Sequence, residues 1–258
     1  MNLLLLEPGE LAPDGAARLT GRRARHVREV LRCEPGDRIA AGVVGGPVGE
    51  AEVVSASAGE LVLRAELDRP PPPPSPVALL LALPRPKILR KVLQAVAAMG
   101  VKRLVLLGSY RVEKAYWSSP LLAPEALRAE LLLGLEQGKD TALPALTLER
   151  FFKPFVEDRL DVLLPGARLL ADPRADGPLE RHAAPAGGVA IAVGPEGGWT
   201  PYEAAELERR GFAPFSLGPR PLRVDQAVPF IVGQAEGWLR RAGRPQEPAA
   251  PPLRAPGP

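Results

Sequence analysis

A run of prolines divides the chain and constrains its fold more than any other feature. Residues 70–74 are five consecutive prolines, and Pro76 follows after a single serine. Proline fixes φ and has no backbone N–H, so such a run forms stiff polyproline II and ends any preceding strand. We interpret residues 70–76 as a spacer between two domains rather than as a ligand for a proline-binding module. With 258 residues, the chain is long enough for two modest domains.

The segment before the prolines, residues 1–69, is predicted to be a small β-barrel with one helix. Short apolar stretches and turn signals predict strands at residues 38–40, 51–54 and 60–65. Residues 22–31 predict a short basic helix, on which Val27, Val30 and Leu31 form an apolar stripe.

The segment after the prolines, residues 77–242, alternates apolar runs with amphipathic stretches. The runs predict strands at residues 77–83, 102–107, 168–171, 189–193 and 212–217, with helices beginning near Pro86, Pro120, Pro201 and Asp225. Buried parallel strands have such continuous apolar sequences, so we expect an α/β domain with a parallel sheet. Residues 243–258 contain six prolines and few apolar residues, and are predicted to be a disordered tail.

Cysteine and histidine usage limits the chemistry that the chain can support. Cys33 is the one cysteine and His26 and His182 are the two histidines, so no intramolecular disulfide or Cys/His metal cluster is expected. No apolar run is long enough for a signal peptide or a membrane span. We therefore expect a cytoplasmic protein without a metal cofactor or a membrane partner.

Basic residues are concentrated in two stretches of a chain whose net charge is only +3. Residues 18–38 hold seven arginines against three acidic residues, and residues 85–114 hold eight basic residues against one acidic residue. This distribution suits a surface that contacts phosphates. Two solvated helix faces would give the same pattern, so charge alone does not decide between them.

A glycine-rich turn follows the apolar run at residues 189–193. Residues 194–203 have the sequence G-P-E-G-G-W-T-P-Y-E, in which Thr200 and Glu203 predict a capping box around Pro201. Glycines permit close backbone approach to a ligand, and open α/β sheets bind ligands where strands end. The spacing matches neither the P-loop nor the dinucleotide-binding motif. A tight strand–helix turn without a ligand is the alternative.

A second loop of unusual composition lies at residues 215–227, with the sequence F-S-L-G-P-R-P-L-R-V-D-Q-A. Two prolines stiffen the loop, and Arg220 and Arg223 suggest contact with an anion. Asp225 is a plausible N-cap of the final helix. An ordinary surface loop is the alternative.

Together these two segments resemble the RsmE-type 16S ribosomal RNA uridine-N3 methyltransferases of the SPOUT superfamily. In that family a G-P-E-G-G turn is followed by L-G-x-R-x-L-R-x-E-T-A. Residues 26–37, the S-x-R at 109–111, and the E-Q at 136–137 with L-P at 143–144 are also similar to family segments. The resemblance covers residues 17–241.

The resemblance implies a deep trefoil knot in the α/β domain, a PUA-like RNA-binding N-terminal domain and a homodimer with the cofactor pocket at its interface. It implies S-adenosyl-L-methionine as cofactor and small-subunit ribosomal RNA as partner. The implied cofactor pocket consists of Gly194, Pro195, Glu196, Gly197, Gly198, Leu217, Gly218, Leu222, Arg223 and Ala227. The basic helix would grip RNA through Arg22, Arg23, Arg25, His26, Arg28 and Arg32.

The implied reaction is methyl transfer to N3 of a uridine. Such a reaction needs alignment of the nucleophile with the methyl group and stabilisation of the charge that develops on the uracil oxygen. Arg223 and then Arg111 are the candidates for oxyanion or phosphate contact. Glu136 or Asp225 could help to remove the N3 proton.

Three positions depart from the family pattern: Ala98 replaces a glutamate, Asp140 an arginine and Gln226 a threonine. Asp140 would reverse a charge near the expected RNA face, although Lys139 could compensate. A methyltransferase for another RNA, such as tRNA, and an RNA-binding protein without turnover therefore stay open as alternatives.

Overall fold

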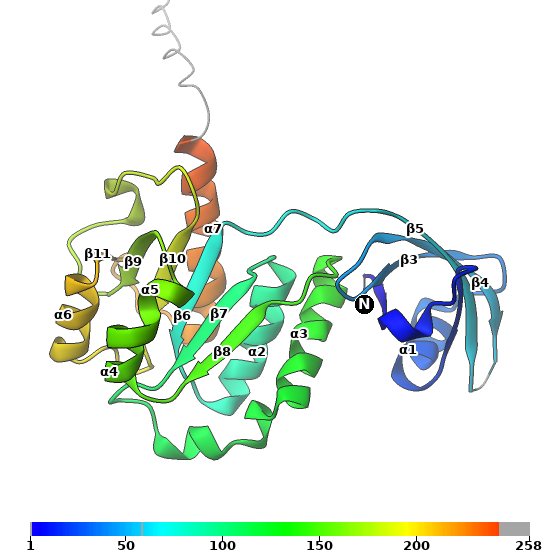
Figure 1. Cartoon of the computed structure of the whole chain (residues 1–258), viewed down its shortest axis with the longest axis horizontal. Coiled ribbons are helices and arrows are strands. Elements are labelled where there is room, and N and C mark those ends of the chain that lie inside the picture. Colours follow the sequence, from blue (N-terminus) through cyan, green and yellow to red (C-terminus); the bar gives the residue numbers. More distant parts are fainter. Residues whose placement is uncertain (1, 58, 243–258) are drawn as a thin grey trace, which may run out of the picture.

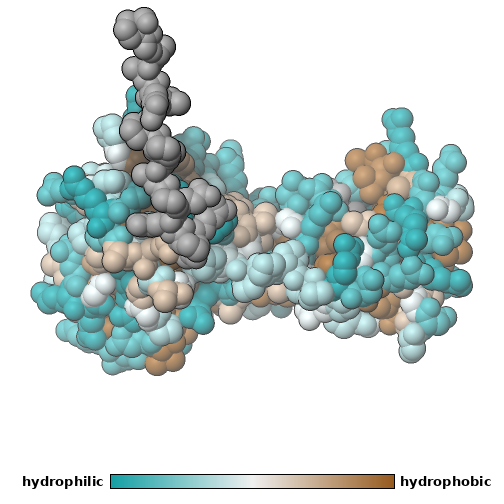
Figure 2. All heavy atoms as spheres, turned by 90° about the horizontal axis from the view of Figure 1, so that it is seen from above, coloured by the Kyte–Doolittle hydropathy of each residue, from teal (hydrophilic) through white to brown (hydrophobic). Residues whose placement is uncertain are grey.

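The computed structural model describes residues 2–57 and 59–242, so the tail predicted at 243–258 lies outside the described residues. Two units of different architecture lie side by side, joined by the extended segment 70–76 (Figure 1). Seen from above, the molecule has two lobes with a narrower waist between them (Figure 2).

The N-terminal unit is built on a five-stranded sheet. Its elements are β1 (Leu4–Leu6), η1 (Pro8–Glu10), β2 (Ala16–Leu19), α1 (Gly21–His26), η2 (Val27–Leu31), β3 (Arg38–Val43), β4 (Val48–Ala56) and β5 (Leu61–Arg69). The strand order is β1-β3-β4-β5-β2, with β1 parallel to β3 and the other pairs antiparallel. The predicted strands are present, whereas β1 and β2 were not predicted. Closure of this sheet into a barrel stays a prediction.

The apolar stripe predicted on the basic helix is only partly present. Val27 is buried, but the side chains of Val30 and Leu31 are 64% and 42% exposed. The α-helical turn of α1 passes into the wider π-helical turn η2, which ends at Arg32 in a left-handed conformation. A π turn changes the spacing of residues along a helix face. A 3.6-residue period therefore no longer predicts which side chains of this last turn are buried.

The C-terminal unit alternates strands and helices. Its principal elements are β6 (Val77–Ala82), α2 (Pro86–Ala98), β7 (Arg103–Leu107), α3 (Pro124–Gly138), β8 (Ala145–Glu149), β9 (Ala167–Ala171), β10 (Val189–Val193), α6 (Pro201–Arg209), β11 (Phe212–Phe215) and α7 (Val224–Ala242). Shorter helical segments are η3 (Lys114–Ser118), η4 (Pro120–Leu122), α4 (Phe152–Pro154), η5 (Phe155–Arg159), α5 (Leu160–Leu163) and η6 (Leu179–Arg181).

These six strands form one parallel sheet in the order β11-β9-β10-β6-β7-β8. The prediction of an α/β domain with a parallel sheet is confirmed. β10 lies in the middle and all five of its residues are buried, as its continuous apolar sequence predicts. The final helix α7 begins at Val224, so Asp225 lies in its first turn and does not cap it.

The order of the strands places a switch point beside β10. From β6 the chain moves outward through β7 to β8, then crosses to β9 on the other side and returns to β10. Open α/β sheets bind ligands at the carboxyl ends of strands where the order reverses. We therefore expect a ligand-binding site at the loops that follow β9, β10 and β11.

Candidate functional site

A large cavity opens at this edge of the sheet. It has a volume of about 620 Å³ and is bounded by the loops after β9, β10 and β11 and by the start of α7. A volume of this order fits a nucleoside-sized ligand. The site therefore lies where the topology places it.

The two loops singled out in the sequence meet in this cavity. All ten predicted cofactor-binding residues, from Gly194 to Ala227, line it, together with Arg111. Gly197 from one loop and Gly218 from the other contribute to the same wall. The structure thus brings together residues that the sequence linked only by resemblance.

Glycine is required at several positions of this wall. A Cβ on Gly194 would lie 3.1 Å from two atoms of the Trp199 indole ring, which is tighter than ordinary packing. Gly198 and Gly218 have φ values of +72° and +105°, in the region that side chains disfavour. The predicted capping box of α6 is confirmed, because Thr200 and Glu203 exchange hydrogen bonds at its N-terminus. The capping box therefore fixes the turn where it enters α6, and residues 194–198 line the cavity.

Arginines surround the mouth of the cavity. Arg111 donates a hydrogen bond to the carbonyl oxygen of Gly197, so its guanidinium lies across the glycine turn. Arg223 lines the cavity with a side chain that is 71% exposed, and Arg220 lines it as well. The positions of Arg111 and Arg223 suit contact with an anionic group bound beside the turn.

The loop after β9 forms a wall that the sequence analysis missed. Ala171, Asp172, Pro173 and Arg174 all line the cavity. Asp172 accepts a hydrogen bond from the guanidinium of Arg174 at 2.7 Å, which lowers the pKa of this carboxyl and raises that of Arg174. The sequence places these residues directly after an apolar strand. That position predicts a cavity wall only once β9 is known to lie beside β10.

Asp225 does not line the cavity, although its neighbours Arg223 and Val224 do. Its carboxylate accepts a hydrogen bond from Lys91 at 3.1 Å and lies 3.6 Å from the Nε of Arg223. The hydrogen bond from Lys91 is the main cause that lowers the pKa of Asp225 below its ordinary value, with Arg223 adding to it. A carboxylate with a lowered pKa is a weaker base, so Asp225 fits a role in holding Arg223 better than a role in proton removal.

A prediction about pH follows from this pair. The pair stabilises the fold where Asp225 is ionised, so its contribution is full above the ordinary aspartate pKa of about 3.9 and is lost as the pH falls through the lowered folded value. Lys91→Met should lower the Tm at pH 7 by roughly 2–4 °C, as expected for an ion pair worth up to about 1 kcal/mol. Thermal melts should show this difference shrinking below about pH 4. Lys87→Met is the control, because Lys87 is an exposed lysine on the same helix that forms no ion pair with another described residue. A Tm deficit for Lys91→Met that is unchanged at acid pH would contradict the assignment.

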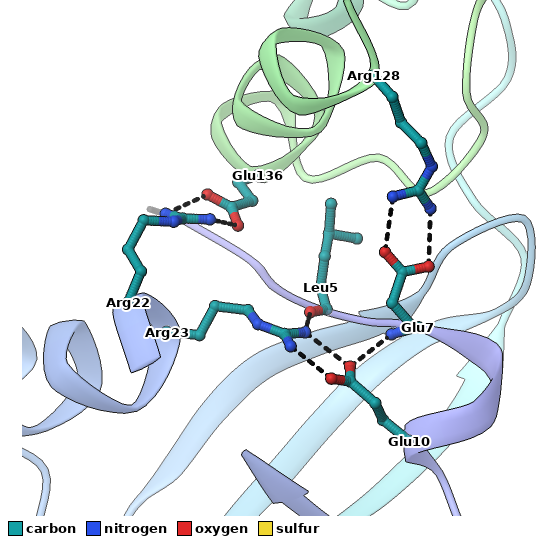
Figure 3. A network of polar contacts seen from close by, with 7 residues as sticks. All are labelled: Leu5, Glu7, Glu10, Arg22, Arg23, Arg128 and Glu136. Atoms are coloured by element: carbon teal, nitrogen blue, oxygen red, sulfur yellow. Dashed lines mark hydrogen bonds and ion pairs between the residues drawn. The ribbon is translucent and has the colours of Figure 1, made fainter. Parts of the chain in front are cut away.

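Glu136 lies outside the cavity, at the junction of the two units. Its side chain is only 4% exposed and accepts two hydrogen bonds from Arg22 of α1, at 2.6 and 3.1 Å (Figure 3). Its backbone carbonyl oxygen accepts hydrogen bonds from the amides of Asn2 and Leu3. Within this chain, Glu136 is therefore placed to join the two units and not to remove a proton in the cavity.

Further ion pairs extend this junction. Arg128 of α3 donates two hydrogen bonds to Glu7, at 2.8 and 2.7 Å. Inside the N-terminal unit, Arg23 donates to Glu10 and to the carbonyl oxygen of Leu5, and Figure 3 shows these groups in one network. Arg22 and Arg23, which were predicted to contact RNA, are thus engaged inside the chain.

The other residues predicted to contact RNA differ in availability. Arg28 donates to Glu29 and to the carbonyl oxygen of Ser57. The Nε2 of His26 is buried and has no hydrogen-bond partner among the described residues, and burial lowers the pKa of this ring. Arg25 and Arg32 are exposed and form no ion pair among the described residues. Contact of this helix with RNA stays a prediction that rests mainly on these two arginines.

Asp140, one of the departures from the family pattern, is a buried structural residue. Its carboxylate lies 2.5 Å from Nζ of Lys102 and accepts a hydrogen bond from the amide of Ala142. The expectation that Asp140 reverses a charge on an RNA-facing surface was wrong, because the carboxylate is neutralised inside the fold. Ala98 packs against α3, because a Cβ on Gly138 of that helix would lie 2.4 Å from the carbonyl oxygen of Ala98. Nothing in the structure explains Gln226.

Two features of the described residues bear on the kind of site. No helix among them has the length and apolar character needed to cross a bilayer. They also contain no group of three or more His, Cys, Asp or Glu side chains arranged to hold a metal ion.

A parallel α/β sheet with a glycine-lined cavity at its switch point is typical of α/β domains that bind nucleotide-like ligands. Residues 71–236 match the model of a family described as RNA methyltransferase domain. A "Ribosomal RNA small subunit methyltransferase E" of Treponema pallidum is 30% identical over 97% of this chain and 98% of that protein. Another of this name, from Synechocystis, is 26% identical over 92% of this chain and 77% of its own length. The chain belongs to the RNA methyltransferase domain family, as a member of the RsmE type.

Solved structures share the fold. A putative methyltransferase of Legionella pneumophila, solved with bound S-adenosyl methionine, has a TM-score of 0.70 at 22% identity and covers 92% of this chain and 97% of its own. A ribosomal RNA small subunit methyltransferase E of Neisseria gonorrhoeae, also bound to S-adenosyl methionine, has a TM-score of 0.70 at 20% identity, with the same coverage. Both units of the chain therefore belong to one recurring architecture.

Proposed function

We propose that this protein transfers a methyl group from S-adenosyl-L-methionine to N3 of a specific uridine in the 16S ribosomal RNA of the small subunit. The observation that carries the proposal is the convergence of the two motif loops on one cavity of about 620 Å³. The names of the full-length relatives support the ribosomal substrate, and the bound ligands of the two solved structures support the cofactor.

The residues of the cavity fit such a cofactor. Glycines and prolines present backbone groups in both loops, and Val193, Leu217 and Ile231 supply apolar surface for a purine ring. The buried Nε1 of Trp199 has no hydrogen-bond partner within the described chain and can donate to a polar ligand atom. Gly194 and Gly197 leave room that a Cβ would fill against Trp199 and Arg111.

The chain's own residues then position and stabilise the reacting groups. When bound, the cofactor supplies an electrophilic methyl group on a sulfonium sulfur. The glycine turn and the Leu217–Gly218 loop hold it in place, and the target uracil must enter beside Arg111 and Arg223. These guanidinium groups would stabilise the negative charge that develops on the uracil oxygen as the N3 proton passes to water. N3 would then take the methyl group, whose bond to sulfur breaks and leaves a neutral thioether. We assign no side chain as the proton acceptor, because Glu136 lies at the junction and Asp225 is held by Lys91.

Assembly and topology are part of the proposal. We infer a homodimer whose second copy covers the cavity mouth, since Leu222 and Phe230 on the loop and helix beside it are 40% and 45% exposed. We further propose that the chain is threaded into a trefoil knot between the loops after β10 and β11, and that the N-terminal sheet is a PUA-like barrel. A protein that modifies ribosomal RNA in this way would act in the cytoplasm.

The proposed activity predicts the loss of one modified nucleoside on deletion of the gene. Mass spectrometry of nucleosides from purified 16S ribosomal RNA should show 3-methyluridine in the parent strain, its absence after deletion, and its return when the wild-type gene is restored. Restoring the gene with Arg111→Ala is the matched control, because it removes the guanidinium beside the glycine turn and should restore little or none. Persistence of 3-methyluridine in the deletion strain would contradict the substrate. Loss of a tRNA modification instead would favour the alternative RNA.

A further inference from the structure

Exposed aromatic side chains gather at the carboxyl edge of the parallel sheet, next to the cavity. Tyr110, Phe151 and Tyr202 are 86%, 67% and 55% exposed, more than any other aromatic side chain of the described residues. They follow β7, β8 and β10, whose carboxyl ends lie along one edge of the sheet, where β8 leads into α4 (Figure 1). We call these three side chains the aromatic rim.

Contacts between the loops hold the aromatic rim together. The amide of Tyr110 donates a hydrogen bond to Glu203 at 2.8 Å, which ties the loop after β7 to the first turn of α6, where Tyr202 lies. The ring of Phe152 packs against the rings of both Tyr202 and Trp199, at centroid distances of 6.4 Å and 6.1 Å. Trp199 lines the cavity, so the rim is continuous with the cavity wall.

The backbone brings Phe151 close to the same place. The amide of Gly108 donates a hydrogen bond to the carbonyl oxygen of Glu149 at 2.8 Å, and a Cβ on Gly108 would lie 2.0 Å from the carbonyl oxygen of Arg150. The loops that carry Tyr110 and Phe151 therefore leave the sheet in direct contact. This close approach requires glycine and leaves the two aromatic rings on neighbouring loops.

Basic side chains without acidic partners flank the aromatic rim. Arg111, Lys114 and Arg150 are exposed, and none forms an ion pair among the described residues. Arg111 also lines the cavity, so the positive charge reaches from the rim to the site of chemistry. Aromatic faces interleaved with unpaired cations are typical of surfaces that bind single-stranded nucleic acid, where bases stack and phosphates meet the cations.

We propose that the aromatic rim is a stacking platform for unpaired bases that flank the target uridine in the RNA substrate. The inference rests on the proposed function and specifies how the RNA is held beside the cavity. A base within a duplex cannot place N3 against a methyl donor, because N3 takes part in the base pair. The substrate must therefore be locally unstacked, and the exposed rings replace the stacking that its neighbouring bases lose.

The test separates stacking from charge and from folding. Tyr110→Ala and Phe151→Ala should each raise the KM for the RNA about tenfold, since an aromatic side chain contributes roughly 1–3 kcal/mol per stacked base. They should leave kcat within about threefold and cofactor affinity unchanged. Tyr110→Phe and Phe151→Tyr keep a ring and should retain near-wild-type values. Val162→Ala, at a side chain that is 78% exposed elsewhere on the domain, is the control for loss of exposed apolar surface.

Salt dependence gives a second, independent readout. Arg150→Ala should weaken RNA binding and reduce the slope of log affinity against log salt by about one, whereas Tyr110→Ala should leave the slope unchanged. The alternative is that a second copy of the chain covers the aromatic rim, and light scattering on the same variants tests it. Loss of a dimer with unchanged RNA affinity would assign the rim to a second copy and overturn the proposal. Unchanged KM in the alanine variants of an active protein would also overturn it. An inactive wild-type protein would instead contradict the proposed function.

Discussion

Gly198→Val should abolish cofactor binding in a protein that still folds. Gly198 has a φ of +72° in the turn after β10, a conformation that a β-branched residue adopts only with strain of about 1–3 kcal/mol. To relieve it, the turn must move, and the backbone groups of Gly197 and Gly194 move with it. Because these groups form the wall of the cavity, we expect calorimetry to show at least a hundredfold loss of affinity for S-adenosyl-L-methionine.

A second glycine provides the matched control. Gly211, between α6 and β11, has a φ of +86° and, like Gly198, has no close neighbour that a Cβ would strike. It does not line the cavity. Gly211→Val should therefore carry a similar backbone cost, visible as a lower Tm, while cofactor affinity stays within about twofold of wild type. Equal loss of affinity in the two variants would mean that the effect comes from stability and not from the turn.

Glu136→Ala should weaken the junction between the two units while sparing the chemical step. The substitution removes a bidentate ion pair with Arg22, whose side chain is 57% exposed and can return to water. We expect a loss of about 2 kcal/mol in the free energy of unfolding and a higher KM for RNA, because the N-terminal unit is held less firmly against the C-terminal unit. A double-mutant cycle with Arg22→Ala should give a coupling energy of about 1–2 kcal/mol.

Two further variants decide between this positioning role and proton removal. Glu136→Gln keeps the shape and can still accept from Arg22, so kcat should stay within about threefold of wild type. A proton acceptor would instead lose about 10²- to 10⁴-fold in kcat on the same change. Glu130→Ala, at an ion-paired carboxylate of the same helix that pairs with Arg90 inside the C-terminal unit, should lower the Tm without raising the KM for RNA.

Local signals in the sequence predicted those parts of the fold that depend on local structure. The apolar run at 189–193, the capping box of Thr200 and Glu203, and the conformational freedom of Gly198 each have a cause within a few residues. The two loops could be assigned to one pocket only through their resemblance to a family, because their spacing alone does not bring them together. The structure then shows both loops in one cavity.

Contacts between residues far apart in the chain could not be predicted from the sequence. Asp172 and Arg174 line the cavity because β9 lies beside β10, and no local pattern encodes the order of strands. The partners Arg22 and Glu136 are 114 positions apart, so each was read as a free charge and assigned to RNA or to catalysis. The π turn at the end of the basic helix likewise defeated a 3.6-residue period and left Val30 exposed.

The most direct measurement is a crystal structure of the protein grown with S-adenosyl-L-methionine. Density for the cofactor should lie in the cavity, with the glycine turn at Gly194–Gly198 on one side, the Leu217–Gly218 loop on the other, and the methyl group directed toward the opening beside Arg111 and Arg223. Density that contacts only one of the two loops, or a cofactor bound elsewhere on the chain, would contradict the account.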